Sequence, residues 1–163
     1  MGVGMLSEGV RGVDLWWAGQ LTPMEAIEAR HSVRSYTDDP LAADVAEPLR
    51  AAIAAVNEEA NLKIQLALDE PRAFSGFKAK LVNFKGAQNY LALIGPECRE
   101  LDGILGYYGE KLVLLAQSLG LNSCWVGGTY KVVNRAYNVD LGQKLSAVVA
   151  LGYGTTAGVP HKS

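Results

Sequence analysis

Four polar side chains gather within five residues near the start of the globular part of the chain: Arg30, His31, Ser32 and Arg34. Arginine binds phosphate oxygens through a planar fork of donors, and serine adds a short donor. The four residues follow a predicted helix, whose C-terminal end also attracts cations through its macrodipole. The pattern therefore indicates either a site for one phosphate or a solvated helix end, and the density of donors favours the phosphate.

A second unusual stretch, Gly120 to Gly128, reads GLNSCWVGG. The paired glycines at its end let a backbone approach a ligand closely and leave amide groups free to donate. Trp125 supplies a flat apolar surface, although a buried tryptophan beside a turn is an alternative. Cys124 could be a nucleophile, but no histidine is near it in sequence, and a small buried hydrophobe is its expected role. Together the two stretches predict a site for a phosphorylated, flat, aromatic cofactor.

The chain ends with two more cationic groups, His161 and Lys162, directly after a glycine-containing loop. They form either a second clamp on the same phosphate or a frayed terminus. The sequence contains no Ser-His-Asp arrangement, no P-loop and no GxGxxG motif. Chemistry performed by a cofactor rather than by side chains is therefore favoured.

Length and composition predict one globular domain, because the chain has 163 residues, 49% hydrophobic and 20% charged. A net charge of −2 argues against a general nucleic-acid binder. Two cysteines and two histidines do not readily form a zinc site, and reduced thiols in the cytoplasm are expected. No apolar run approaches the ~20 residues of a membrane span, and residues 1–21 do not resemble a signal peptide.

Helices and strands alternate along the chain, which predicts a single α+β or α/β domain. The sequence Thr22-Pro23-Met24-Glu25 starts a helix through a capping box. Pro48 implies either a kink in the next helix or a start near Glu47. Further elements are expected as helices over 42–60, 97 or 99–119 and 132–137, and as strands over 62–68, 90–94 and 145–153.

Three glycines at three-residue intervals, Gly103, Gly106 and Gly109, interrupt the longest predicted helix. Each weakens a helix by roughly 1 kcal/mol relative to alanine. Either another backbone, such as that of a partner subunit, approaches closely, or the first half of this helix is irregular. Residues 1–21 form an N-terminal extension in which Trp16 and Trp17 either pack onto the body or a partner, or belong to a leader.

The motifs together resemble those of the nitroreductase family, the FMN-dependent NAD(P)H oxidoreductases. Residues 24–36 resemble the opening motif of the family, and residues 115–128 (LAQSLGLNSCWVGG) resemble its second motif. Residues 148–154 resemble the late strand, which leads to a basic segment matched by His161 and Lys162. The resemblance covers a single domain over residues 22–163, short at its C-terminus, and is closest to the small nitroreductases.

The resemblance implies a three-layer α+β fold with a mixed, mostly antiparallel sheet flanked by helices. It also implies a homodimer with FMN at the interface, in which the long helix lies between subunits. The activity would pass hydride from NAD(P)H through the flavin to a nitroaromatic or quinone. The residues implied to bind FMN are Arg30, His31, Ser32 and Arg34 (phosphate and ribityl chain), Trp125, Val126, Gly127 and Gly128 (ring), and His161 and Lys162 (phosphate).

One departure from the family pattern keeps a second hypothesis open. Many members carry an N-x-Q-P-W loop, whereas residues 57–63 of this chain read NEEANLK. Asn83 and Lys85 are candidates to replace the contacts of that loop. The alternative function is a non-catalytic module that binds a flavin or another nucleotide on the same fold.

Overall fold

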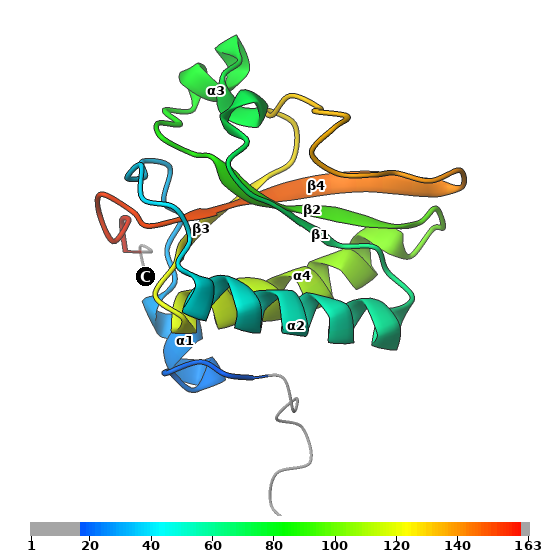
Figure 1. Cartoon of the computed structure of the whole chain (residues 1–163), viewed down its shortest axis with the longest axis horizontal. Helices are drawn as coiled ribbons and strands as arrows, with labels where there is room; N and C mark the ends of the chain where they lie inside the picture. Colours follow the sequence, from blue (N-terminus) through cyan, green and yellow to red (C-terminus); the bar gives the residue numbers. More distant parts are fainter. Residues whose placement is uncertain (1–16, 161–163) are drawn as a thin grey trace, which may run out of the picture.

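A four-stranded antiparallel sheet forms the centre of the computed structural model, which describes residues 17–160 (Figure 1). The strand order is β1-β2-β4-β3, and every neighbouring pair is antiparallel. The bounds are β1 (Gln65–Ala67), β2 (Asn89–Pro96), β3 (Asn122–Val126) and β4 (Gln143–Gly152). Parallel contacts occur as isolated bridges, which join Ser32 to Ser123 and Ser35 to Lys85.

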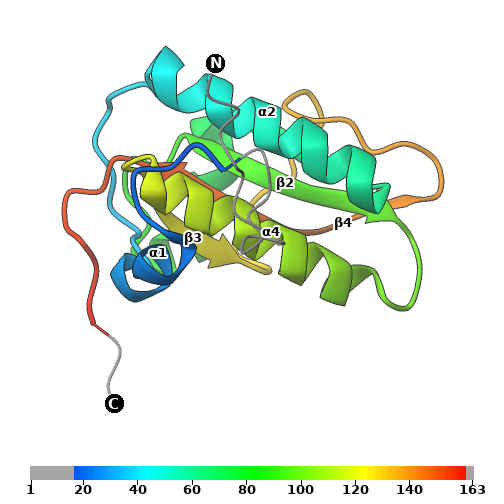
Figure 2. The same cartoon turned by 90° about the horizontal axis from the view of Figure 1, so that it is seen from below.

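Helices cover both faces of this sheet and complete the expected three-layer α+β fold. Helices α2 (Ala43–Ala60) and α4 (Leu101–Ser118) lie on one face, as Figures 1 and 2 show. The 3₁₀ helix η1 (Pro71–Phe74) and helix α3 (Phe77–Leu81) lie on the other. Helix α1 (Pro23–Ala29) packs against α4.

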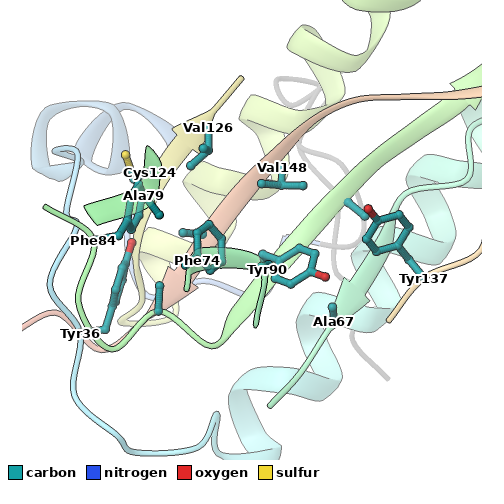
Figure 3. Close-up of a cluster of buried hydrophobic side chains, with 14 of the residues drawn as sticks. Tyr36, Ala67, Phe74, Ala79, Phe84, Tyr90, Cys124, Val126, Tyr137 and Val148 are labelled. Carbon is teal, nitrogen blue, oxygen red and sulfur yellow. The ribbon is translucent and has the colours of Figure 1, made fainter. Parts of the chain in front are cut away.

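The pleat of the central strands divides the hydrophobic core into two clusters. Leu91, Leu93 and Val149 point towards α2 and α4. Tyr90 and Val148 point to the other face, where aromatic residues from η1 and the following segment pack around them (Figure 3). Because β2 is buried on both sides, its sequence is a continuous apolar run rather than an alternating one.

Helix α1 begins with the capping box predicted from the sequence. The Thr22 side chain accepts a hydrogen bond from the Glu25 N–H at 3.3 Å, and the Glu25 carboxylate accepts one from the Thr22 N–H at 2.7 Å. The start expected near Glu47 is wrong, because α2 begins at Ala43 and contains Pro48. It ends at Ala60, and the C-cap residue Asn61 adopts the left-handed conformation with φ 51°.

The helix expected over 132–137 is wrong. This segment forms a turn in which the Ala136 N–H donates to the Val133 carbonyl at 3.0 Å. Just before this segment, the Lys131 N–H donates a hydrogen bond to the carbonyl of Ala73, a residue distant in sequence, at 2.7 Å. Two β-branched residues and an asparagine follow and give little intrinsic helical preference.

Helix α4 is regular from Leu101 to Ser118, so an irregular first half is wrong. Gly109 has a cause within the chain: a Cβ there would lie 2.7 Å from Cη2 of Trp125 and 3.3 Å from Cδ1 of Leu93. Gly103 and Gly106 have no such neighbour, since no atom lies within 4 Å of a Cβ built at either. Their face of α4 is open, and its covering by a partner stays a prediction.

The last residues of the N-terminal extension pack onto the end of α4. The Leu21 N–H donates to the Ser118 hydroxyl at 2.7 Å, and the Gln20 N–H donates to the Ser118 carbonyl at 3.1 Å. The Trp17 indole donates to the Leu21 carbonyl at 3.0 Å and packs against the adjacent core cluster. Trp16 lies outside the described residues. Within residues 17–160, no helix combines the length and apolar character that crossing a bilayer requires.

Candidate functional site

The two polar and glycine-containing stretches of the sequence lie side by side in the fold. Ser32 and Ser123 form a parallel bridge, and the Val33 N–H donates to the Ser123 carbonyl at 3.0 Å. The segment that follows α1 therefore contacts β3, the edge strand that leads to Gly127 and Gly128, and then pairs with Lys85 and Gly154. The two stretches therefore meet within one chain at Ser32 and Ser123, four residues before Gly127.

Glu110 on α4 connects these two stretches through its carboxylate. Its Oε1 lies 3.5 Å from Nε of Arg30, and its Oε2 accepts a hydrogen bond from the Trp125 indole at 2.9 Å. The Arg30 side chain is 16% exposed, and its Nη1 is buried without a hydrogen-bond partner in the described chain. A buried guanidinium donor without an acceptor is costly, so it marks a position that an anion would satisfy.

Arg34 and Ser32 lie around the Cys124 thiol, which is only 2% exposed. Burial raises the pKa of Cys124, while Arg34, Ser32 and Arg30 partly oppose that rise. The thiol therefore stays protonated at neutral pH and fills space, as expected, instead of acting as a nucleophile.

The backbone of Lys85 lies beside this site. Its N–H donates to the Arg34 carbonyl, and its carbonyl accepts from the Tyr36 N–H, both at 2.9 Å. Of the two candidates to replace the missing loop, Lys85 is thus placed directly beside the first motif. Asn57 has a structural role instead, because its amide bonds both backbone groups of Ile64 at 2.9 and 2.8 Å.

The glycine pair forms an exposed bend after β3. A Cβ at Gly127 or Gly128 would meet no atom within 4 Å, so their backbone is open to a ligand. The Val126 side chain is 3% exposed and belongs to the core, which leaves its backbone for ligand contact. The Trp125 ring packs over Gly109 of α4.

The C-terminal segment returns to the first motif. A Cβ at Gly158, where φ is +86°, would lie 2.6 Å from Cβ of His31 and 3.2 Å from the Ser32 carbonyl oxygen. His161 and Lys162 lie outside the described residues. Among residues 17–160, no group of three or more His, Cys, Asp or Glu side chains could hold a metal ion.

Sequence reasoning missed Glu110 and the strand β3. Glu110 is a single acidic residue in a largely apolar helix, and its partners are reached only through tertiary packing. The sequence Gly109-Glu110 was the available signal for this contact. The glycine leaves room for the ring of an indole, and the carboxylate beside it can accept a hydrogen bond from the indole N–H.

The comparison with protein families identifies the chain. A family model described as "Putative TM nitroreductase" matches residues 22–163. The chain belongs to this nitroreductase family. A search of the curated proteins finds no match.

Solved structures of nitroreductases share this fold at low sequence identity. A structure of a putative NADH dehydrogenase/NAD(P)H nitroreductase from Bacteroides thetaiotaomicron is 18% identical, with a TM-score of 0.66 over 86% of this chain and 91% of the other. A putative nitroreductase in complex with FMN from Desulfovibrio desulfuricans is 19% identical, with a TM-score of 0.64 over 88% and 92%. An NADPH:FMN oxidoreductase from Vibrio harveyi, complexed with NAD⁺, is 17% identical, with a TM-score of 0.67 over 86% and 72%.

Proposed function

We propose that this nitroreductase-family chain is an FMN-dependent oxidoreductase that acts as a homodimer. The observation that carries the proposal is the junction of the first motif with β3, where Arg30 Nη1 is buried without a partner. The site combines concentrated cationic donors with an edge strand that leads to an exposed glycine backbone. This combination fits a ligand that has a phosphate at one end and a flat ring at the other.

The donor set fits FMN in its chemistry. Arg30, Ser32 and Arg34, with Lys85, would bind the phosphate and ribityl chain, and the amides of Gly127 and Gly128 would donate to the ring. Bound FMN would supply the redox chemistry, accepting hydride from NAD(P)H and reducing a nitroaromatic or quinone. The remaining residues proposed for FMN binding are His31, Trp125, Val126, His161 and Lys162.

The related structures support this proposal, since they include an NADPH:FMN oxidoreductase and a nitroreductase in complex with FMN. The open face of α4 at Gly103 and Gly106 supports the homodimer, because a glycine face lets a second backbone approach. The two cysteines are free, which agrees with a cytoplasmic enzyme.

The test is a titration of the flavin-free protein with FMN, followed by its absorbance spectrum before and after addition of NADPH or NADH. Arg34→Ala should weaken FMN binding about tenfold or more, because a charge-assisted hydrogen bond is lost. Arg50→Ala is the matched control, since Arg50 is an exposed arginine on α2 whose nearest ion-pair partner is Glu47 at 4.0 Å.

The outcomes separate the two hypotheses. Failure to bind FMN at micromolar concentration would refute the proposed function. Binding of FMN without oxidation of either reduced nicotinamide would instead select the non-catalytic flavin-binding module. Equal FMN affinity of the Arg34 and Arg50 variants would show that the first motif does not hold the cofactor.

A further inference from the structure

A second basic region lies outside the candidate flavin site. It surrounds a cavity of about 400 Å³ between η1 and the turn segment 131–135. Its lining includes three cationic side chains, Arg72, Lys131 and Arg135, and no acidic residue. A volume of this size is in the range of small-molecule sites.

The cations of this cavity lie in two stretches of sequence without acidic residues, the first of which follows directly after Glu70. Residues 71–96 and 111–139 contain seven of the 15 Lys and Arg residues and none of the 17 Asp and Glu residues. Because the whole chain has a net charge of −2, the positive charge here is a local excess. Such a surface favours an anionic ligand.

The three cations differ in the donors that they leave free. Glu70 binds Nε and Nη2 of Arg72 at 2.7 and 2.6 Å, so one edge of that guanidinium is neutralised and Nη1 is left for another acceptor. The described chain gives the Lys131 ammonium and the Arg135 guanidinium no acceptor. The stem of Lys131 lies along Gly76, where a Cβ would be 3.0 Å from its Cε. The net positive charge therefore comes from Lys131 and Arg135.

Polar and apolar groups complete the lining. Asn134 adds an amide beside the cations, and Val132, which is 64% exposed, adds an apolar surface. The Ser75 hydroxyl donates to the Arg72 carbonyl at 2.9 Å, so its remaining capacity is as an acceptor. Cations next to an exposed apolar side chain suit a phosphate attached to an organic group better than a free inorganic ion.

Both segments that line the cavity continue in sequence to residues of the candidate flavin site. The segment that begins with η1 runs through α3 to Lys85, whose backbone bonds Arg34 and Tyr36. The other wall follows directly from Gly127 and Gly128. The two walls are joined where the Lys131 N–H donates to the Ala73 carbonyl at 2.7 Å. The residues that line the cavity are therefore linked along the chain to Lys85 on one side and to Gly128 on the other.

We propose that this cavity binds the 2′-phosphate of NADPH and makes the enzyme prefer NADPH to NADH. The inference rests on the proposed function, because it names which reduced nicotinamide the flavin site uses. NADH lacks the 2′-phosphate, so the charge of Lys131 and Arg135 distinguishes the two molecules.

The test uses the full chain and the double variant Lys131→Ala/Arg135→Ala. Calorimetric titration with adenosine 2′,5′-bisphosphate measures the cavity directly, with 5′-AMP and inorganic phosphate as comparison ligands. The bisphosphate affinity should fall at least about tenfold in the double variant, because charge-assisted hydrogen bonds are removed. The ratio of kcat/KM for NADPH to that for NADH should fall by a similar factor. Lys78→Ala/Lys80→Ala on α3 is the matched control, since it removes the same charge outside the lining.

The result that would overturn the inference is an absence of bisphosphate binding, or binding that the double variant and the control weaken equally. Inorganic phosphate that binds as tightly as the bisphosphate would also overturn it, because the adenosine would then make no contact. Bisphosphate binding that depends on Lys131 and Arg135 in a protein that binds no FMN would retain the nucleotide-phosphate site and reject the proposed function.

Discussion

Substitution of the three glycines of α4 by alanine separates the two reasons for their presence. Gly109 lies under the Trp125 ring, whereas Gly103 and Gly106 face open space. In the interior of a helix, alanine is more favourable than glycine by about 0.8–1 kcal/mol. Without other contacts, each substitution should therefore stabilise the protein by about that amount.

Gly109→Ala should nevertheless destabilise the protein. Its Cβ would lie 2.7 Å from Cη2 of Trp125, so the indole must move, and Leu93 at 3.3 Å limits the space available. Overpacking of this kind costs about 1–3 kcal/mol. Displacement of the indole also weakens its 2.9 Å hydrogen bond to Glu110, which contributes about 1 kcal/mol. The net expectation is a loss of about 1–3 kcal/mol, after subtraction of the gain in helix propensity.

Urea unfolding at one protein concentration measures this loss, with the m value used to check that the unfolding reaction is unchanged. A loss of 1 kcal/mol corresponds to about 2–4 °C in Tm for a chain of this size. Gly103→Ala is the matched control in the same helix and should unfold at a higher urea concentration in the monomer. A Gly109→Ala variant as stable as the wild type would refute the packing of Trp125 against α4. Sedimentation of Gly103→Ala measures whether the proposed homodimer is weakened. If a partner backbone lies close to Gly103, the added methyl group should make the dimer dissociate more readily.

Three further predictions concern single side chains. Glu110→Ala should lower the free energy of unfolding by about 1–2 kcal/mol, because the Arg30 guanidinium and the Trp125 indole both lose their acceptor. A urea midpoint equal to that of the wild type would contradict this prediction. Burial raises the pKa of Cys124 and shields its thiol, whereas Cys98 is exposed. A thiol reagent at pH 8 should therefore modify Cys98 first and Cys124 only on unfolding. Rapid reaction of both thiols in the native protein would contradict this prediction. Hydrogen bonding to Arg72 lowers the pKa of Glu70, so its contribution to stability is present above pH 4.5 and is lost as the pH falls through the folded pKa. The stability difference between wild type and Glu70→Gln should therefore shrink as the pH is lowered below 4.5, and a difference independent of pH would contradict the pairing.

The parts of the fold that were predicted from the sequence depend on local signals. The start of α1 could be predicted because its capping box involves Thr22 and Glu25, which are three residues apart. The end of α4 could be predicted because Gly120, with φ +90°, follows it. Strand β2 was recognised because a short apolar run before Gly95-Pro96 has few other structures available.

The parts that were missed depend on contacts between distant segments. Strand β3 alternates between the two core clusters, with Cys124 on one face and Trp125 on the other, and therefore lacks a simple polar and apolar period. The turn at 132–137 replaced the expected helix because the backbone of Lys131 binds Ala73 across the cavity. The position of Lys85 beside Arg34 follows from a backbone pairing that no pattern within either segment indicates.

The attachment of residues 20 and 21 to Ser118 affects how tightly an anion can be held. These bonds fasten the beginning of α1 to the end of α4, while Glu110 joins the end of α1 to the middle of the same helix. The two helices are thus braced at two points, and Arg30 is oriented before any ligand arrives. A preorganised binding site loses little conformational entropy when the ligand binds, so more of the interaction energy appears as affinity.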